Sequence, residues 1–147
     1  MAEHVEFQYT HIDGGTWASG FIRIDQSRFE FVCSYLFHNP LQEFLSAIYQ
    51  LLPGLAAFPR KEISLTMWDE PVKYIWEIKR VDQKDAIIRI SEKGYDVKSV
   101  LVFEEYVDLH DLIRSVIRCI MRNHALRSND AIDRMYQEFT VYVKQLK

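Results

Sequence analysis

The sequence lacks several features by which function is often recognised. Its 147 residues include 2 cysteines, 5 glycines and 4 prolines. It has no CxxC pair and no two histidines at HxH or HxxxH spacing, so it carries no metal-binding motif. Gly14-Gly15 is an isolated pair, so neither a GxGxxG nor a Walker-type phosphate loop is present. We therefore expect no metal and no cofactor.

Long apolar runs and a basic excess are also missing. No run approaches the roughly 18 residues of a membrane span, and residues 1–6 do not resemble a signal peptide, so we expect a cytoplasmic protein. The net charge of −3 gives the whole molecule no general attraction for nucleic acid or anionic membrane. Residues 1–110 hold 17 acidic and 11 basic residues, whereas residues 111–147 hold 4 and 7.

The two cysteines, Cys33 and Cys119, each lie inside an apolar run. This setting predicts two buried free thiols in a reducing compartment, although a disulfide stays open, since it depends on a proximity that sequence does not reveal. The composition is 48% hydrophobic and 14% aromatic, enough for a sizeable core. Size and composition together predict one globular domain over residues 1–147.

Apolar residues alternate with other residues over much of the chain. The clearest case starts at Phe29, where apolar side chains recur at every second position as far as Phe37. This period is typical of strands, and glycine suits the tight turn expected at residues 13–16. The predicted strands cover 7–12, 17–24, 29–37, 63–67, 74–78, 86–90 and 97–103.

Three stretches show apolar stripes at helical spacing. The first follows Asn39 and Pro40, which suit the N-cap and the first helical position, and it stops at Pro53-Gly54. The second begins at Asp108, and the third begins at residues 128–130. Strands, a helix, strands and two helices in this order predict an α+β fold. We expect a mainly antiparallel sheet of about six to seven strands with three helices packed on one face.

Two acidic spots are candidate partner-binding sites. One contains Trp68, Asp69 and Glu70, because a tryptophan beside carboxylates at a strand break suits an interface. The other contains Glu104, Glu105 and Asp108 at a strand-to-helix junction, where acidic residues steer a basic partner. The alternative is ordinary turn chemistry with Trp68 packed in the core.

Other residues support rival functions. Arg114, Arg118 and Arg122 form a stripe that suits phosphate contacts or the solvated face of an amphipathic helix. His110, between two aspartates, suits a general base or an exposed first-turn residue. An enzyme built from distant residues would use His38, His110 and Glu104.

Four segments together resemble a class of small bacterial α+β proteins, the immunity or antitoxin proteins encoded beside polymorphic toxins of the LXG kind. The segments are Asn39-Pro40-Leu41 after an aromatic strand, Asp69-Glu70-Pro71 with Tyr74–Ile78, Ile88-Arg89-Ile90, and the helix from Asp108. The resemblance implies a non-enzymatic protein that covers the active site of its toxin. It also implies a cognate toxin partner, which could be a nuclease domain with a basic face. No functional residue of the class transfers to this chain.

We therefore expect a non-enzymatic immunity protein that neutralises a toxin by direct binding. The alternatives are a small-molecule or peptide binding module, the unrecognised enzyme described above, and a nucleic-acid binder acting through the arginine stripe. The acidic balance of residues 1–110 favours a basic partner.

Overall fold

The computed structural model describes residues 4–11, 15–36, 38–94 and 98–146. The predicted turn at Asp13-Gly14 lies outside these residues, as do the predicted strand ends at Ile12, Phe37 and Val97. In the described part of the chain, no helix is long and apolar enough to cross a membrane.

The first sheet contains three antiparallel strands, β1 (Val5–His11), β2 (Trp17–Ile24) and β3 (Ser27–Ser34), in that spatial order. Their alternation puts one face in the core, where Phe7, Ile22 and Phe31 are buried. The opposite face carries polar and half-buried side chains.

The second sheet contains four antiparallel strands, again in sequence order. They are β4 (Glu62–Asp69), β5 (Val72–Arg80), β6 (Asp85–Lys93) and β7 (Val100–Asp108). Trp76, Ile78 and Ile88 are fully buried on the inner face. A register shift after Ile90 marks a β-bulge between β6 and β7.

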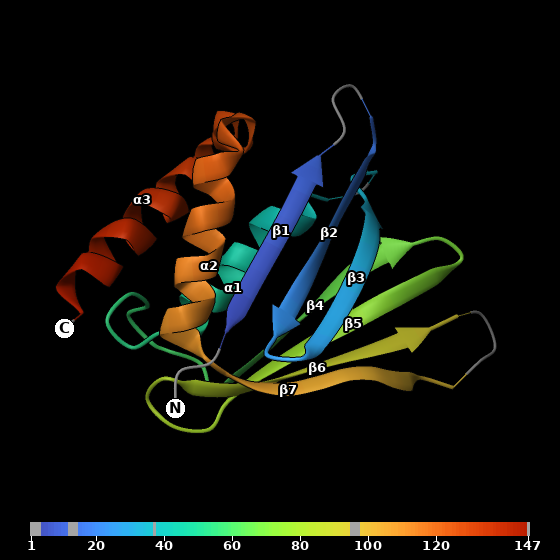
Figure 1. Cartoon of the computed structure of the whole chain (residues 1–147), viewed down its shortest axis with the longest axis horizontal. Helices are drawn as coiled ribbons and strands as arrows, with labels where there is room; N and C mark the ends of the chain where they lie inside the picture. The colour runs from blue at the N-terminus through green and yellow to red at the C-terminus, as the bar shows by residue number, and fades with distance from the viewer. Residues whose placement is uncertain (1–3, 12–14, 37, 95–97, 147) are drawn as a thin grey trace.

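The seven strands form two sheets and not the single sheet that the sequence predicts. The helices also do not all pack on one face of a sheet, because helix α2 (Leu109–Arg122) contacts β1 and helix α1 (Pro40–Leu51) contacts β4. The chain leaves β3 through a helix before it enters β4, so these two strands are not held together by a short turn. The strands of the two sheets cross (Figure 1), and the inner faces meet through aromatic side chains. Phe29 and Phe31 lie edge-on to Trp76, with centroids at 6.0 and 5.8 Å.

Helix α1 (Pro40–Leu51) begins as the sequence predicts. The Asn39 side chain accepts a hydrogen bond from the backbone N–H of Gln42 at 3.0 Å, which caps the helix start. Phe44 stacks on Phe7 at 4.8 Å and meets Trp76 edge-on at 5.5 Å. Helix α1 therefore packs against both sheets.

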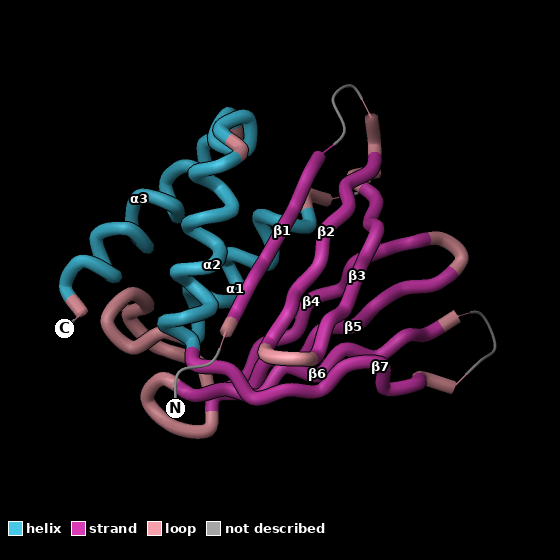
Figure 2. Tube along the Cα trace, viewed as in Figure 1, coloured by secondary structure: helices cyan, strands magenta, loops and turns pink. Residues whose placement is uncertain are grey.

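The chain ends in helices α2 (Leu109–Arg122) and α3 (Asp130–Gln145), with a short 3-10 helix, η1 (His124–Ser128), between them. The sequence predicts both α-helices but not η1. Figure 2 shows α2 beside β1 and α3 on the outside of the helical layer. Buried side chains from both sheets and all three α-helices form one contiguous core.

Candidate functional site

The hairpin that joins β4 to β5 projects beyond β3, away from the helices (Figure 1). Trp68 and Asp69 end β4, and Glu70 and Pro71 form the turn with a cis peptide bond between them. Successive strand residues point to opposite faces, so Trp68 and Asp69 face opposite sides of the sheet. Trp68 is half-buried and Glu70 is exposed. The predicted hairpin residues therefore supply two separate surfaces.

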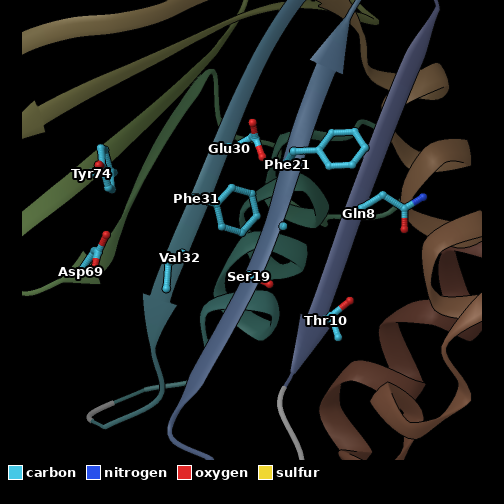
Figure 3. Close-up of a pocket in the computed structure, with 10 residues that line it drawn as sticks. Gln8, Thr10, Ser19, Phe21, Glu30, Phe31, Val32, Asp69 and Tyr74 are labelled. Atoms are coloured by element: carbon cyan, nitrogen blue, oxygen red, sulfur yellow. The ribbon is translucent and has the colours of Figure 1, made fainter.

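On the Asp69 side, a groove of about 410 Å³ extends from the hairpin across the edge of β3 onto the outer face of the first sheet (Figure 3). We call it the hairpin groove. Its lining combines aromatic, hydroxyl, amide and carboxylate groups, from Gln8, Thr10, Ser19, Gly20, Phe21, Glu30, Phe31, Val32, Asp69 and Tyr74. Five strands from both sheets contribute, so the groove depends on the way the sheets cross.

Gly20 permits the close packing beneath this groove. A Cβ atom at this position would lie 2.1 Å from the Gln8 carbonyl oxygen and 2.8 Å from Cζ of Phe31. Without a side chain there, the Phe31 ring packs against β2. A glycine inside a strand often marks such a close approach, and here it shapes the floor of the groove.

The groove carries two carboxylates, Glu30 and Asp69. Glu30 is exposed, and its pair with Arg28 is a loose surface contact with Nη2 3.7 Å from Oε1. Burial raises the pKa of Asp69 above its ordinary value. The Tyr74 hydroxyl is held by donating to Glu92 at 3.1 Å, and burial is the main cause of its raised pKa. A cation entering the groove would offset the desolvation of Asp69.

On the opposite side of the hairpin, Trp68 borders a smaller hollow of about 260 Å³. Lys73 and Lys93 line it and lie directly opposite each other on β5 and β6. The Lys73 Nζ atom lies 5.1 Å from the Trp68 ring centroid, a cation–π contact. Like charges directly opposite each other are unfavourable, so the lysine pair favours an anionic group nearby, and the Glu70 carboxylate lines the same hollow. The sequence predicts an acidic surface around Trp68. The structure shows a surface of mixed charge.

The second predicted spot does not join the hairpin. Glu104 lies on the outer face of the second sheet and pairs with Arg89, whereas Glu105 accepts a hydrogen bond from the Ser27 hydroxyl at 2.8 Å. Asp108 ends β7, caps α2 and pairs with Lys84 at 2.8 Å.

Burial alone would raise the pKa of Asp108. The hydrogen bonds from Lys84 and from two backbone N–H groups hold it below its ordinary value instead. These three carboxylates thus have structural partners and do not form one cluster with the hairpin.

The histidines proposed for an enzyme lie far apart. His38 precedes α1 and pairs with Glu43. His110 lies near the other end of α1. Its Nε2 atom is 3.2 Å from the Tyr142 hydroxyl, and that hydroxyl donates to the carbonyl of Pro53, just after α1. Helix α1 has 12 residues, about 18 Å at the usual rise, so the two histidines do not share a site. His110 is half-buried, so the prediction of an exposed residue is also wrong.

The arginine stripe of α2 is partly used within the fold. Arg114 pairs with Asp111 at 3.2 Å, and Arg118 donates to the Val5 carbonyl at 3.3 Å. Arg122 is exposed. These contacts favour the interpretation of a solvated helix face over a phosphate-binding stripe.

Both cysteines are buried and free, as the sequence predicts. Burial is the main cause of their raised pKa values, about 12 for Cys33 and about 11 for Cys119. Thiols with such values are poor nucleophiles at neutral pH. Within the described residues, no group of three histidine, cysteine or acidic side chains could hold a metal ion.

Sequence reasoning missed the half of the groove that comes from the first sheet. Thr10, Ser19, Phe21 and Glu30 lie on its outer face. Alternation along each strand places them outward, and a glycine within a strand pattern at Gly20 hints at a close approach. Neither signal reveals that the β4–β5 hairpin lies beside them.

The fold defines an α+β protein with two crossed antiparallel sheets. No protein-family model matches the chain, and no curated protein sequence matches it. Among solved structures, it is similar to a chain of the CdiA-CT/CdiI toxin and immunity complex from Enterobacter cloacae. The TM-score is 0.43 and the identity 10%, covering 95% of this chain and 99% of the other. A score of this size does not establish a shared fold.

Proposed function

We propose that this protein is a non-enzymatic immunity protein that neutralises a cognate bacterial toxin by binding it directly. The observation that carries the proposal is the hairpin groove, which combines the carboxylates of Glu30 and Asp69 with the apolar surfaces of Phe21, Val32 and Tyr74. The Asp69 end of this surface suits the side chain of a lysine or arginine, because the charge meets the carboxylate while the aliphatic stem packs on Val32 and Tyr74. At the other end, Arg28 of this chain lies over the Phe21 ring, 3.9 Å from its centroid.

The finer proposal is that the partner is a nuclease domain with a basic face. Toxins that act on nucleic acid need positive charge at their catalytic surface, and an acid-lined groove complements that charge. Trp68 would anchor the same partner from the other side of the hairpin. Beside it, Lys73 and Lys93 would select a carboxylate of the partner, which gives the interface a fixed orientation.

The first test is a pull-down of the tagged chain with the products of neighbouring genes supplied, followed by a high-salt wash. We expect one stoichiometric partner that is toxic when expressed alone and harmless when expressed with this chain. An empty pull-down, or a partner whose toxicity is unchanged, would overturn the immunity proposal.

The second test assigns the surface by measuring partner affinity in matched variants. We expect Asp69→Asn to weaken binding about tenfold, the effect of losing a charge-assisted hydrogen bond worth roughly 1.4 kcal/mol. The control is Glu62→Gln, an exposed carboxylate at the opposite end of the same strand. Equal affinities for both variants and the original protein would leave the immunity role standing and remove the groove from it.

A further inference from the structure

Strand β7 forms an edge of the second sheet, and its first half is unusually apolar for an exposed strand. In the described part of the chain, β7 pairs with β6 and with no strand on its other side. Three successive side chains, Val100, Leu101 and Val102, are 54%, 52% and 42% exposed. An exposed apolar edge is a template for pairing with another strand, and folded proteins usually cover or charge it.

In the same molecule, the β1 edge of the first sheet is covered by a helix. Helix α2 lies along β1 and directs side chains at its carbonyl groups. Arg118 donates to Val5 at 3.3 Å, and Asn123 and Cys119 donate to Tyr9 at 3.5 and 3.9 Å. No comparable contact from the described residues reaches the stretch from Val100 to Val102.

The charged residues along this edge are arranged so that those of one copy would complement those of a second, antiparallel copy. Lys98 precedes the apolar stretch and is exposed, whereas Glu104 follows it and is exposed beside its partner Arg89. If two copies of the segment paired in antiparallel fashion about Leu101, Lys98 of each would lie opposite Glu104 of the other. The apolar residues would meet in the middle. Opposite charges across neighbouring strands stabilise such a pair, and a parallel arrangement would bring like charges together.

We propose that residues 98–104, which lead into β7 and form its first half, bind the same segment of a second copy of this chain, antiparallel and about a two-fold axis through Leu101. The two four-stranded sheets then become one continuous sheet of eight strands, and the paired edge is removed from solvent. The interface uses the β7 edge and not the hairpin groove, so a dimer would carry two grooves. The inference does not depend on the proposed function.

The test measures the oligomeric state of the full chain by sedimentation velocity over a wide concentration range. We expect a concentration-dependent dimer for the original protein and a monomer for Leu101→Lys. Val141→Lys is the matched control, because Val141 is 56% exposed on α3, away from this edge, and this variant should still dimerise. A monomeric original protein at every concentration, or a dimeric Leu101→Lys variant, would overturn the proposal.

A charge exchange tests the antiparallel arrangement separately. Lys98→Glu should weaken the dimer about fivefold, roughly the effect of one or two surface charge pairs, and adding Glu104→Lys should restore it. Circular dichroism confirms that each variant is folded. A dimer that is unaffected by Lys98→Glu, or not restored by the second change, would rule out this pairing.

Discussion

Asp69 is the residue to which the proposed function assigns the main charge contact, and its burial has a consequence for stability. Burial raises its pKa in the folded protein above the ordinary value, so the folded chain holds this proton more tightly than the unfolded chain does. Ionised Asp69 therefore costs stability at neutral pH, and the cost disappears as the pH falls through the raised pKa. A partly buried carboxylate that costs stability when ionised is a candidate for binding a cation.

The corresponding prediction is that Asp69→Asn stabilises the protein at pH 7 while it weakens partner binding. The midpoint of urea unfolding should rise modestly at pH 7 and stay unchanged at pH 3, where the original residue is protonated too. A lower midpoint at pH 7 would show that the ionised carboxylate has a stabilising partner, contrary to this account.

Trp68 is the second residue that the proposed function assigns to partner binding. Truncation of a tryptophan anchor typically costs about 2 kcal/mol or more, so Trp68→Ala should weaken partner affinity roughly thirtyfold or more. Trp17→Ala is the control, because Trp17 is 37% exposed on the first sheet and lies outside both the groove and the smaller hollow. Equal losses in the two variants would indicate a general effect of removing a tryptophan.

At the scale of elements, local sequence signals identified most of the pieces. Asn39 caps the first helix as predicted, and the second helix begins next to Asp108, as predicted, with Asp108 as its cap, because capping depends on a few neighbouring residues. Strand ends were less accurate. Strand β3 ends at Ser34, before the end of the aromatic alternation, and β7 runs to Asp108, beyond the predicted end at Phe103. These ends depend on pairing partners that lie far away in the sequence.

Helices α2 and α3 meet where His110 Nε2 lies 3.2 Å from the Tyr142 hydroxyl. From the burial of His110 we predict that stability depends on pH. Burial lowers the pKa of His110, although Asp108 opposes the effect. A histidine with a lowered pKa in the folded state favours the fold while it is neutral, so this contribution is lost as the pH falls below the ordinary value near 6.5. The free energy of unfolding should decrease between pH 7 and pH 5.

His110→Gln should flatten this decrease, and His124→Gln, which changes an exposed histidine, should leave it intact. Urea titrations at several pH values measure both effects. An identical pH dependence in the His110 variant and the original protein would contradict the assignment.

At the scale of the whole molecule, the arrangement of the sheets was the feature that sequence could not supply. Alternation reveals which face of a strand is buried, but not which strand lies beside it. The period-two pattern predicts that Phe29 and Phe31 share one face of a strand, yet their partner across the interface, Trp76, lies more than forty residues away. The groove was missed for the same reason, since it exists only where the two sheets cross.

Trp76 should be the most sensitive position for the packing of the two sheets. It is fully buried and contacts Phe29, Phe31 and Phe44. Trp76→Ala should lower the free energy of unfolding by about 3–5 kcal/mol. Trp76→Phe should cost less, because the buried indole N–H finds no acceptor among the described residues. Similar costs for the two variants, measured by urea unfolding, would contradict this view of the interface.

The most direct test of the central claim is the equilibrium affinity between this purified protein and the candidate toxin that the proposal expects to be encoded beside it, measured by isothermal titration calorimetry. The account predicts one-to-one binding per chain in the nanomolar range, weakened by Asp69→Asn and Trp68→Ala and unaffected by Glu62→Gln and Trp17→Ala. No detectable heat of binding at the highest attainable concentrations would contradict the claim that this protein acts by occupying a toxin.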